Sequence, residues 1–190
     1  TWTLRDRERI LDLFEQLCGA RLLYNYIWPG GLSHDLPPHF IERTIEFVDY
    51  FEPKIEELNN LLTTNKIFIE RSADVGILPA DVGINFGVSG PSLRGSGVNF
   101  DLRKNEPYSF YEKFDFEVPI GKGEMGTVGD CWDRYYVRVL EITESVKIIR
   151  QACSQMPDGD VHAAVPKKIR PAIGEVYGRY ESARGDVGFY

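Results

Sequence analysis

The chain has 190 residues, of which 43% are hydrophobic and 13% aromatic, which suits one domain with a hydrophobic core or part of a larger one. The formal net charge is −7, and no cluster of Lys and Arg is long enough to follow a phosphate backbone, which argues against nucleic acid as a partner. No apolar run reaches the roughly 18 residues of a membrane-spanning helix. The three cysteines, Cys18, Cys131 and Cys153, are too scattered for a disulfide framework and favour a reducing compartment.

Three segments have the apolar periodicity of helices. The first covers residues 3–26 and is expected to fray toward its end, ahead of Pro29. The second covers 38–64, opens at Pro37 and Pro38, and is expected to kink at Pro53. The third covers 130–156, with Asp130 as its N-cap and apolar residues spaced three and four apart: Trp132, Tyr135, Val139, Ile142, Val146, Ile149, Cys153 and Met156. We expect the three to pack as an antiparallel bundle of long helices.

The segments between and after these helices predict small β elements. Residues 66–121 are rich in glycine, and Phe114, Phe116 and Val118 alternate with charged residues as in a strand. Residues 174–190 have the pattern of a β-hairpin that turns at 183–186. The fold class is therefore mainly α, in the α+β sense. Because the second strand runs to the last residue and the first helix starts at once, we expect a longer polypeptide around this chain.

Two motifs with chemical associations have simpler interpretations. Gly121–Gly126 has the G-x-G-x-x-G spacing of a dinucleotide fingerprint, with Glu144 near the distance of a ribose contact. The helix is expected only at Asp130, however, and no second apolar strand follows, so a flexible loop is favoured. His34, Asp35 and His39 lack a further ligand for a metal, and capping contacts are favoured for them. Redox work by Cys153 is disfavoured by its place in the helix seam.

Several phrases, in order over nearly the whole chain, resemble the 49-kDa subunit (the D subunit) of respiratory complex I, the NADH:quinone oxidoreductase. They are LFEQLCGARLLYNYIWPGGLSHDLP at 13–37, NKIFIERSADVGIL at 65–78, SGPSLRGSGVNFDLRK at 89–104, PYSFYEKFDFEVPIG at 107–121, GDCWDRYYVRVLEITESVKIIRQACSQMP at 129–157 and GEVYGRYESARGDVGFY at 174–190. The resemblance implies that about the central half of the family's chain is present.

The resemblance also implies a fold like that of the large subunit of nickel–iron hydrogenases. ESARG at 181–185 is similar to the hydrogenase phrase E-A-P-R-G, but the His that follows in hydrogenases is missing here. None of the three cysteines has a C-x-x-C partner. These departures favour a quinone-type subunit over a hydrogenase.

The function implied by the resemblance is a part in quinone reduction. The chain would help form the cavity where quinone is reduced, beside the terminal iron–sulfur cluster of the B subunit, with the C subunit and the membrane-embedded H subunit as further partners. NADH and quinone would be substrates of the whole complex, with iron–sulfur clusters on partner subunits and no cofactor bound directly here. The chain would lie peripherally on the cytoplasmic face of the bacterial inner membrane. The His and Tyr expected at the quinone headgroup would lie upstream of residue 1, so no catalytic residue is assigned and the isolated chain should be inactive.

Four residues are candidates for contact with the cluster or with neighbouring subunits: Arg21, Arg94, Asp101 and Arg103. Arg21 matches the family phrase GARMHAAYIRPGG, whereas Leu23 stands in place of its His and Trp28 in place of its Arg. For the other three, the glycines of 87–97 would let the backbone lie close to a neighbouring surface, where Arg94 or Arg103 pairs with a carboxylate. Pairing within the chain, with Asp101, is the alternative. Two other functions stay open: a non-catalytic assembly scaffold, and the large subunit of an energy-converting, membrane-bound hydrogenase.

Overall fold

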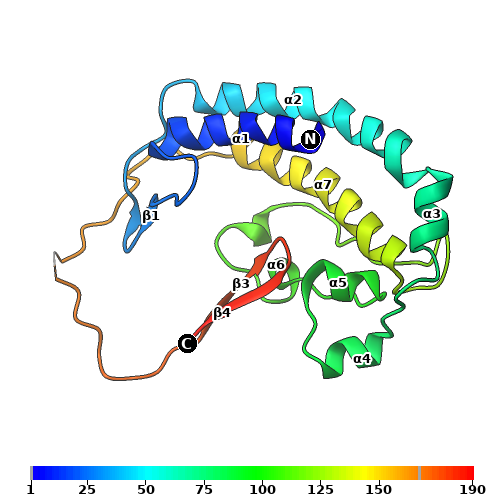
Figure 1. Cartoon of the computed structure of the whole chain (residues 1–190). Coiled ribbons are helices and arrows are strands. Elements are labelled where there is room, and N and C mark those ends of the chain that lie inside the picture. Colours follow the sequence, from blue (N-terminus) through cyan, green and yellow to red (C-terminus); the bar gives the residue numbers. More distant parts are fainter. Residues whose placement is uncertain (1, 167) are drawn as a thin grey trace. The chain divides into compact units, whose positions relative to one another are not determined.

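The computed structural model describes residues 2–166 and 168–190. It contains helices and two small antiparallel sheets, so the chain is a mixed α+β protein (Figure 1). The chain groups into two compact units: unit 1 takes 1–51 and 152–174, and unit 2 takes 52–151 and 175–190. None of the helices in the described ranges is both long and apolar enough to cross a bilayer.

In unit 1, α1 (Trp2–Cys18) packs antiparallel to the first part of α2 (Phe40–Leu58) (Figure 1). The hydroxyl of Tyr50, late in this part of α2, donates to Asp6 Oδ1 near the start of α1 at 2.9 Å. Arg43, at the start of α2, donates to Gln16 Oε1 near the end of α1 at 2.6 Å. The start of each helix therefore pairs with the far part of the other, so α1 and this part of α2 run antiparallel.

The first helix is shorter than predicted. It ends at Cys18 rather than near residue 26, because Gly19 adopts φ +74° and donates its N–H to the carbonyl of Glu15 at 2.8 Å. A glycine in this left-handed conformation, bonded back to the last turn, is a common helix terminator. The chain then forms the short antiparallel pair β1 (Ile27–Trp28) and β2 (Gly31–Leu32).

The second helix agrees with the prediction in its extent but differs at its start. α2 is followed directly by the π-helical turn η1 (Asn59–Thr63), so the two cover most of 38–64, and α2 continues through Pro53. Pro37 and Pro38 lie ahead of the helix rather than in its first turn, since the Phe40 N–H donates to the Pro37 carbonyl.

The third predicted helix is confirmed as α7 (Cys131–Ser154). Asp130 is its N-cap, because its Oδ1 accepts from the Asp133 N–H at 2.8 Å. The buried face is wider than the predicted seam: Val137 and Asp133 are buried along with seam residues such as Trp132, and Met156 lies exposed beyond the helix end. The buried face is wider because a heptad seam describes contact with one other helix, whereas α7 is also covered by the extended segment at 114–118.

The segment between α2 and α7 is built from short helices. These are α3 (Lys66–Ser72), α4 (Ala80–Asn85), α5 (Gly90–Gly95), α6 (Leu102–Asn105) and the 3-10 turn η2 (Tyr111–Lys113).

The strand predicted at 114–118 was wrong. The Asp115 N–H donates to Gln151 Oε1 at 2.8 Å, and Gln151 Nε2 donates to the Asp115 carbonyl at 2.7 Å. The Glu117 N–H donates to Glu144 Oε2 at 2.9 Å. Side chains of α7 therefore take the hydrogen bonds that a neighbouring strand would supply.

The C-terminal hairpin is confirmed. β3 (Gly178–Ser182) pairs antiparallel with β4 (Gly185–Phe189), and Ala183 and Arg184 form a turn tighter than predicted. The hairpin lies against α5, where Gly90 has φ +63° and a Cβ on it would be 2.3 Å from the Gly185 Cα. The close backbone approach predicted for the glycine-rich segment thus occurs within the chain.

Candidate functional site

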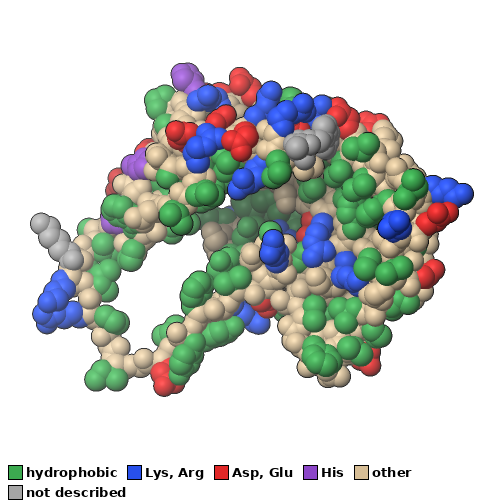
Figure 2. Space-filling model, viewed as in Figure 1, with side chains coloured by type: hydrophobic (Ala, Val, Ile, Leu, Met, Phe, Trp, Pro, Cys, Tyr) green, Lys and Arg blue, Asp and Glu red, His purple; other side chains and the backbone are tan. Residues whose placement is uncertain are grey.

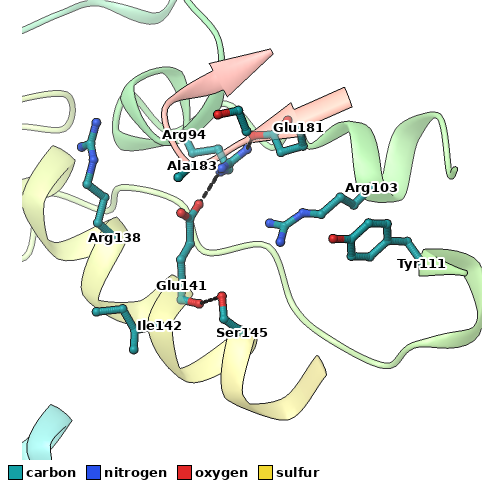
Figure 3. Close-up of a pocket in the computed structure, with 10 residues that line it drawn as sticks. Arg94, Arg103, Tyr111, Arg138, Glu141, Ile142, Ser145, Glu181 and Ala183 are labelled. Carbon is teal, nitrogen blue, oxygen red and sulfur yellow. Dashed lines mark hydrogen bonds and ion pairs between the residues drawn. The ribbon is translucent and has the colours of Figure 1, made fainter. Parts of the chain in front are cut away.

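The interior of unit 2 contains an ion-pair network centred on Arg94 of α5, which is only 1% exposed. Its Nη2 lies 2.6 Å from Glu141 Oε1 on α7, and its Nη1 lies 2.9 Å from Glu181 Oε1 on β3 (Figure 3). The same Nη1 is 3.5 Å from Asp101 Oδ2 and donates to the Phe100 carbonyl at 3.0 Å. One guanidinium therefore joins α5, α7, β3 and the residue before α6. We call these four charged residues the Arg94 network.

Asp101 has a second, tighter partner in Arg103. The Arg103 side chain donates through Nε to Oδ1 at 3.0 Å and through Nη2 to Oδ2 at 2.6 Å, the two-pronged geometry that favours Arg over Lys. Oδ1 also accepts the Arg103 backbone N–H at 2.9 Å and so caps α6. Burial alone would raise the pKa of Asp101, but the hydrogen bonds and charge of Arg103, with Arg94, lower it. Arg94 and Arg103 are thus paired with Asp101 within the chain, which was the alternative to an intersubunit contact.

Glu181 behaves differently from Asp101. Burial raises its pKa above the ordinary value, its bond to Arg94 only partly opposes that rise, and the charge of Asp101 adds to it. Its main chain is fixed as well, since the Glu181 N–H donates to the Tyr108 hydroxyl at 3.1 Å. Glu181 thus joins the hairpin to the network through both side chain and backbone.

A cavity of about 400 Å³ adjoins the network, within the size range of small-molecule sites. Its described lining residues supply charges and hydroxyls but neither His nor Cys: Arg94, Arg103, Tyr111, Arg138, Glu141, Ile142, Ser145, Glu181, Ser182 and Ala183. In Figure 3 the Arg103 and Glu141 side chains extend toward the same space from different elements. This arrangement can hold and orient a charged group, whereas it contains no nucleophile paired with a base.

Arg21, the fourth candidate, belongs to unit 1. It donates to three carboxylates on successive turns of α1: Asp12 at 2.7 Å, Glu15 at 2.8 Å and Glu8 at 2.6 Å. These hydrogen bonds raise the pKa of Arg21. The arginine is therefore fixed on the acidic face of α1, while the other three candidates lie together in unit 2.

The residues after Arg21 expose large apolar side chains. Leu23 is 93% exposed and has φ +61°, and Ile27 is 82% exposed. Leu22 and Trp28 are also exposed, although the Trp28 Nε1 donates to Asn25 Oδ1 at 2.9 Å. We call 21–28 the apolar loop.

His34, one of the residues considered as metal ligands, makes hydrogen bonds to other residues of unit 1. His34 Nε2 contacts the Leu17 carbonyl at 2.6 Å, and its Nδ1 contacts Ser33 Oγ at 2.8 Å. The part of the chain that the structure describes holds no group of three His, Cys, Asp or Glu side chains placed to bind a metal.

Backbone N–H groups of the G-x-G-x-x-G loop are bound by other parts of the chain. The Gly121 N–H donates to the Arg94 carbonyl at 2.8 Å, and the Gly123 N–H donates to Asp133 Oδ2 at 2.9 Å. α7 begins only at Cys131, so the loop is not the start of a phosphate-facing helix.

The family described as "Respiratory-chain NADH dehydrogenase, 49 Kd subunit" matches residues 1–182. The chain belongs to this 49-kDa subunit family. The chain is 57% identical over 189 residues to the D subunit of NADH-quinone oxidoreductase from Chlorobium phaeovibrioides, an alignment that covers 98% of this chain and 47% of that protein. The corresponding protein of Chlorobium luteolum is 58% identical, covering 98% and 48%. The D 1 subunit of NADH-quinone oxidoreductase from Cytophaga hutchinsonii is 51% identical over 196 residues, covering 100% and 50%. The chain spans about half the length of the curated relatives it matches, and the resemblance predicted from its phrases is confirmed.

Sequence reasoning missed two members of the Arg94 network in this 49-kDa-family chain. Glu141 lies one turn of α7 from Arg138 in a stretch with no distinctive motif, and it is 47 residues from Arg94. Glu181 was noticed as part of ESARG but not given a partner, and it is 87 residues from Arg94. The hairpin also contains Arg179, Arg184 and Asp186, so a charge at residue 181 did not by itself point to a buried partner.

Proposed function

We propose that this 49-kDa-family chain is part of the peripheral arm of an NADH:quinone oxidoreductase, where it helps form the quinone-reduction cavity beside the terminal iron–sulfur cluster. The observation that supports this most is the family match over residues 1–182, together with relatives at 51–58% identity that are named as the D subunit of NADH-quinone oxidoreductase. NADH and quinone are then substrates of the whole complex. The iron–sulfur clusters reside on partner subunits, and the long-helix, hydrogenase-like architecture is completed in the full-length protein.

The proposed partners follow from the same assignment. The cluster-bearing B subunit, the C subunit and the membrane-embedded H subunit are the expected neighbours, and the complex attaches the chain peripherally to the cytoplasmic face of the bacterial inner membrane. In this setting the chain's own residues shape the apolar wall of the cavity and hold fixed charges around it, while electron transfer takes place on the partner's clusters and the quinone.

The apolar loop supports an interface on unit 1. Leu23 and Ile27 are nearly fully exposed, and contiguous exposed apolar side chains commonly mark surfaces that a partner covers. Arg21 at the start of the loop is held by three carboxylates, so its position is fixed before any partner binds. We infer that the apolar loop contacts the cluster-bearing partner. Because Leu23 cannot titrate, any proton exchange near that cluster must use another group.

A second part of the proposal concerns Arg94, Asp101 and Arg103. Their charges are already paired within unit 2, with Arg94 and Asp101 each only 1% exposed. We infer that they serve the complex by fixing the conformation of the glycine-rich segment 87–104, which then presents a defined surface to a neighbour.

The test uses the full-length protein with an affinity tag in its own host. Leu23→Asp places a charge on the apolar loop without disturbing a buried side chain, and an Asp tolerates the positive φ at this position. We expect the cluster-bearing partner to be lost from the purified complex, and inhibitor-sensitive NADH:quinone reduction to be lost with it. Leu4→Asp, on the exposed face of α1, is the matched control and should leave both unchanged.

Two results would contradict the proposal. If Leu23→Asp retains the cluster-bearing partner and full activity, the apolar loop is not the interface. If the purified assembly contains its full set of iron–sulfur clusters and still reduces no quinone, a non-catalytic scaffold role replaces the redox one.

A further inference from the structure

Arg138 and Ser92 contact each other beside the start of α5 and keep unused hydrogen-bond donors, and Arg184 lies on the hairpin turn that packs on the same end of α5. Arg138 of α7 donates through Nη1 to the Arg134 carbonyl and through Nη2 to Ser92 Oγ at 3.2 Å. A guanidinium has five N–H donors, so three of those on Arg138 have no acceptor among the described residues. Ser92 Oγ accepts a hydrogen bond from Arg138, and the Ser92 hydroxyl proton has no acceptor in the described ranges.

Arg184 contributes the second guanidinium. It is the second residue of the two-residue turn between β3 and β4, and its side chain is exposed, with no hydrogen bond or ion pair to a described residue. The turn is fixed by the close approach of Gly185 to Ser89 and Gly90 at the start of α5, the helix that also contains Ser92. The cavity beside the network is lined by Arg138, by Ser182 at the end of β3 and by the turn residue Ala183, which directly precedes Arg184.

Most of the charges around Arg138 are positive. Burial lowers the pKa of Arg138; Glu141 opposes that shift, while the positive charges of Arg134, Arg94 and Arg184 reinforce it. Arg138 shares Glu141 with Arg94, because Glu141 Oε1 accepts from both Nε and Nη2 of Arg94. Figure 2 shows Lys and Arg side chains gathered over the hairpin turn and α5, on a chain whose net charge is −7. A partly buried cation whose one nearby counter-charge is shared with another arginine is costly, and a bound anion would lower that cost.

We propose that Arg138, Arg184 and Ser92 form a binding site for an oxyanion at the rim of this cavity. The site suits a carboxylate or a phosphate group, whose paired oxygens accept from two guanidinium donors at once, with the Ser92 hydroxyl as a further donor. The anion has two possible sources: a free oxyanion in solution, or a carboxylate side chain of a neighbouring subunit. In either case it joins α7, α5 and the hairpin turn, which meet elsewhere through the Arg94 network.

The experiment titrates the full-length protein with inorganic phosphate, with sodium chloride added to keep the ionic strength constant. Binding is measured by calorimetry, and the melting temperature is followed in parallel. Phosphate should raise the melting temperature where chloride does not, since a ligand that binds only the folded state stabilises it. Arg184→Gln and Arg138→Gln should each weaken phosphate binding about tenfold or more, the loss expected for a charge-assisted hydrogen bond.

The controls separate binding at this site from a general effect of charge. Arg7→Gln removes the same charge from the exposed face of α1 and should bind phosphate like the unaltered protein. Arg184 is exposed, so its variant folds and gives an answer even if Arg138→Gln does not. Equal effects of phosphate and chloride, or unchanged binding by Arg184→Gln, would overturn the proposal.

The source of the anion is decided by repeating the titration on the assembled complex. If phosphate still binds there and binding still depends on Arg184, the natural occupant is a free oxyanion. If phosphate binds the free protein but not the complex, a carboxylate of a neighbouring subunit occupies the site. Both results support an oxyanion site. Neither depends on quinone reduction, so this proposal can fail independently of the redox assignment.

Discussion

Glu181 and Asp101 both contact Arg94, yet their pKa values move in opposite directions. Burial raises the pKa of each carboxyl, but at Asp101 the two-pronged bond from Arg103 outweighs it. At Glu181 the opposing cation is Arg94, which is shared with Glu141, and a long hydrogen bond from the Leu102 N–H at 3.4 Å adds little. The difference between the two acids therefore comes from how many cations each has, and it makes Glu181 the residue whose ionisation opposes folding.

This gives a prediction for Glu181→Gln. Because the folded-state pKa of Glu181 is raised above 4.5, folding favours its protonated form. Protonated Glu181 contributes its full share to the free energy of unfolding when the pH is below the pKa of this carboxyl in the unfolded chain. That contribution is lost as the pH rises through the pKa of Glu181 in the folded protein. Glutamine does not titrate, so the free energy of unfolding of Glu181→Gln relative to the unaltered protein should increase as the pH rises through that interval. Urea denaturation at a series of pH values from about 4 to 8 measures it.

Glu106→Gln is the control for that series, because it removes an exposed carboxylate that pairs with Arg179 at the surface. It reports the pH trend of the rest of the molecule. A difference between Glu181→Gln and the unaltered protein that stays flat or decreases with pH would show that burial does not set the behaviour of Glu181.

At this scale the sequence predicted part of the candidate site. Arg94, Asp101 and Arg103 were singled out because charge follows a dense run of glycine, and their pairing within the chain was one of the two interpretations. Glu141 and Glu181 were not assigned to the network, because partners 47 and 87 residues away depend on tertiary packing that no local pattern encodes. Arg138 was missed for the same reason.

At the scale of single elements, Asp130 does more than cap α7. Its Oδ1 accepts from the Asp133 N–H, and its Oδ2 accepts from the Asp74 N–H at 2.9 Å, which ties the end of α3 to the start of α7. The carboxylate is 1% exposed, so water cannot replace it. Removing it would leave two amides without acceptors, one of them buried at the helix start.

We therefore expect Asp130→Ala to lower the free energy of unfolding by about 2–4 kcal/mol, combining the loss of a cap with an unpaired buried group. Asn65→Ala is the matched control. Asn65 caps α3 through its Oδ1 on the exposed surface, and its loss should cost only about 1 kcal/mol. Urea denaturation measures the free energy of unfolding of both variants. If the two variants lose equal amounts, burial of Asp130 is not the reason for its larger expected effect.

The elements themselves were predictable to different degrees. α7 and the hairpin followed from long, regular patterns with clear ends. The strand at 114–118 did not form, because alternating Phe and charge is equally suited to an extended segment that lies along a helix, and the helix offered Gln151 and Glu144 as partners. The first helix was extended too far because the apolar residues after Gly19 continue its pattern, although the glycine ends it.

At the scale of the whole molecule, the chain forms two compact units, and two of the boundaries between them fall within helices. The chain passes between the units inside α2, after Phe51, and near the end of α7, after Gln151. Composition does not change at these points, so the sequence contains no linker that would show the division. The remaining crossing, near Gly174, lies in an exposed stretch without helix or strand.

That stretch leads to a prediction for limited proteolysis. Trypsin should cleave early after Lys168, which is exposed in a segment without regular structure, whereas the bond after Arg170 precedes a proline. The hairpin is anchored independently of that segment: Arg179 pairs with Glu106, Glu181 with Arg94, and the Asp186 N–H donates to Ser89 Oγ at 2.9 Å. The fragment 169–190 should therefore stay bound to the rest of the cleaved chain under native conditions.

Size-exclusion chromatography of the cleaved protein, followed by mass spectrometry, measures whether the fragment is retained. Gly90→Val is the control that should release it, because the added side chain would collide with the Gly185 backbone. Release of the fragment from the unaltered protein would mean that the hairpin contacts are too weak to hold it.

The separation of 87 residues between Arg94 and Glu181 also affects synthesis of the protein. A ribosome that adds about 5–20 residues per second needs roughly 4–17 seconds to proceed from the arginine to the glutamate. During that time the guanidinium has its near neighbour Asp101 but lacks the acid that joins it to the hairpin, so the surrounding segment remains hydrated and open. Nascent chains therefore pass through a period in which chaperones can bind this region, and that period ends only when β3 and β4 emerge.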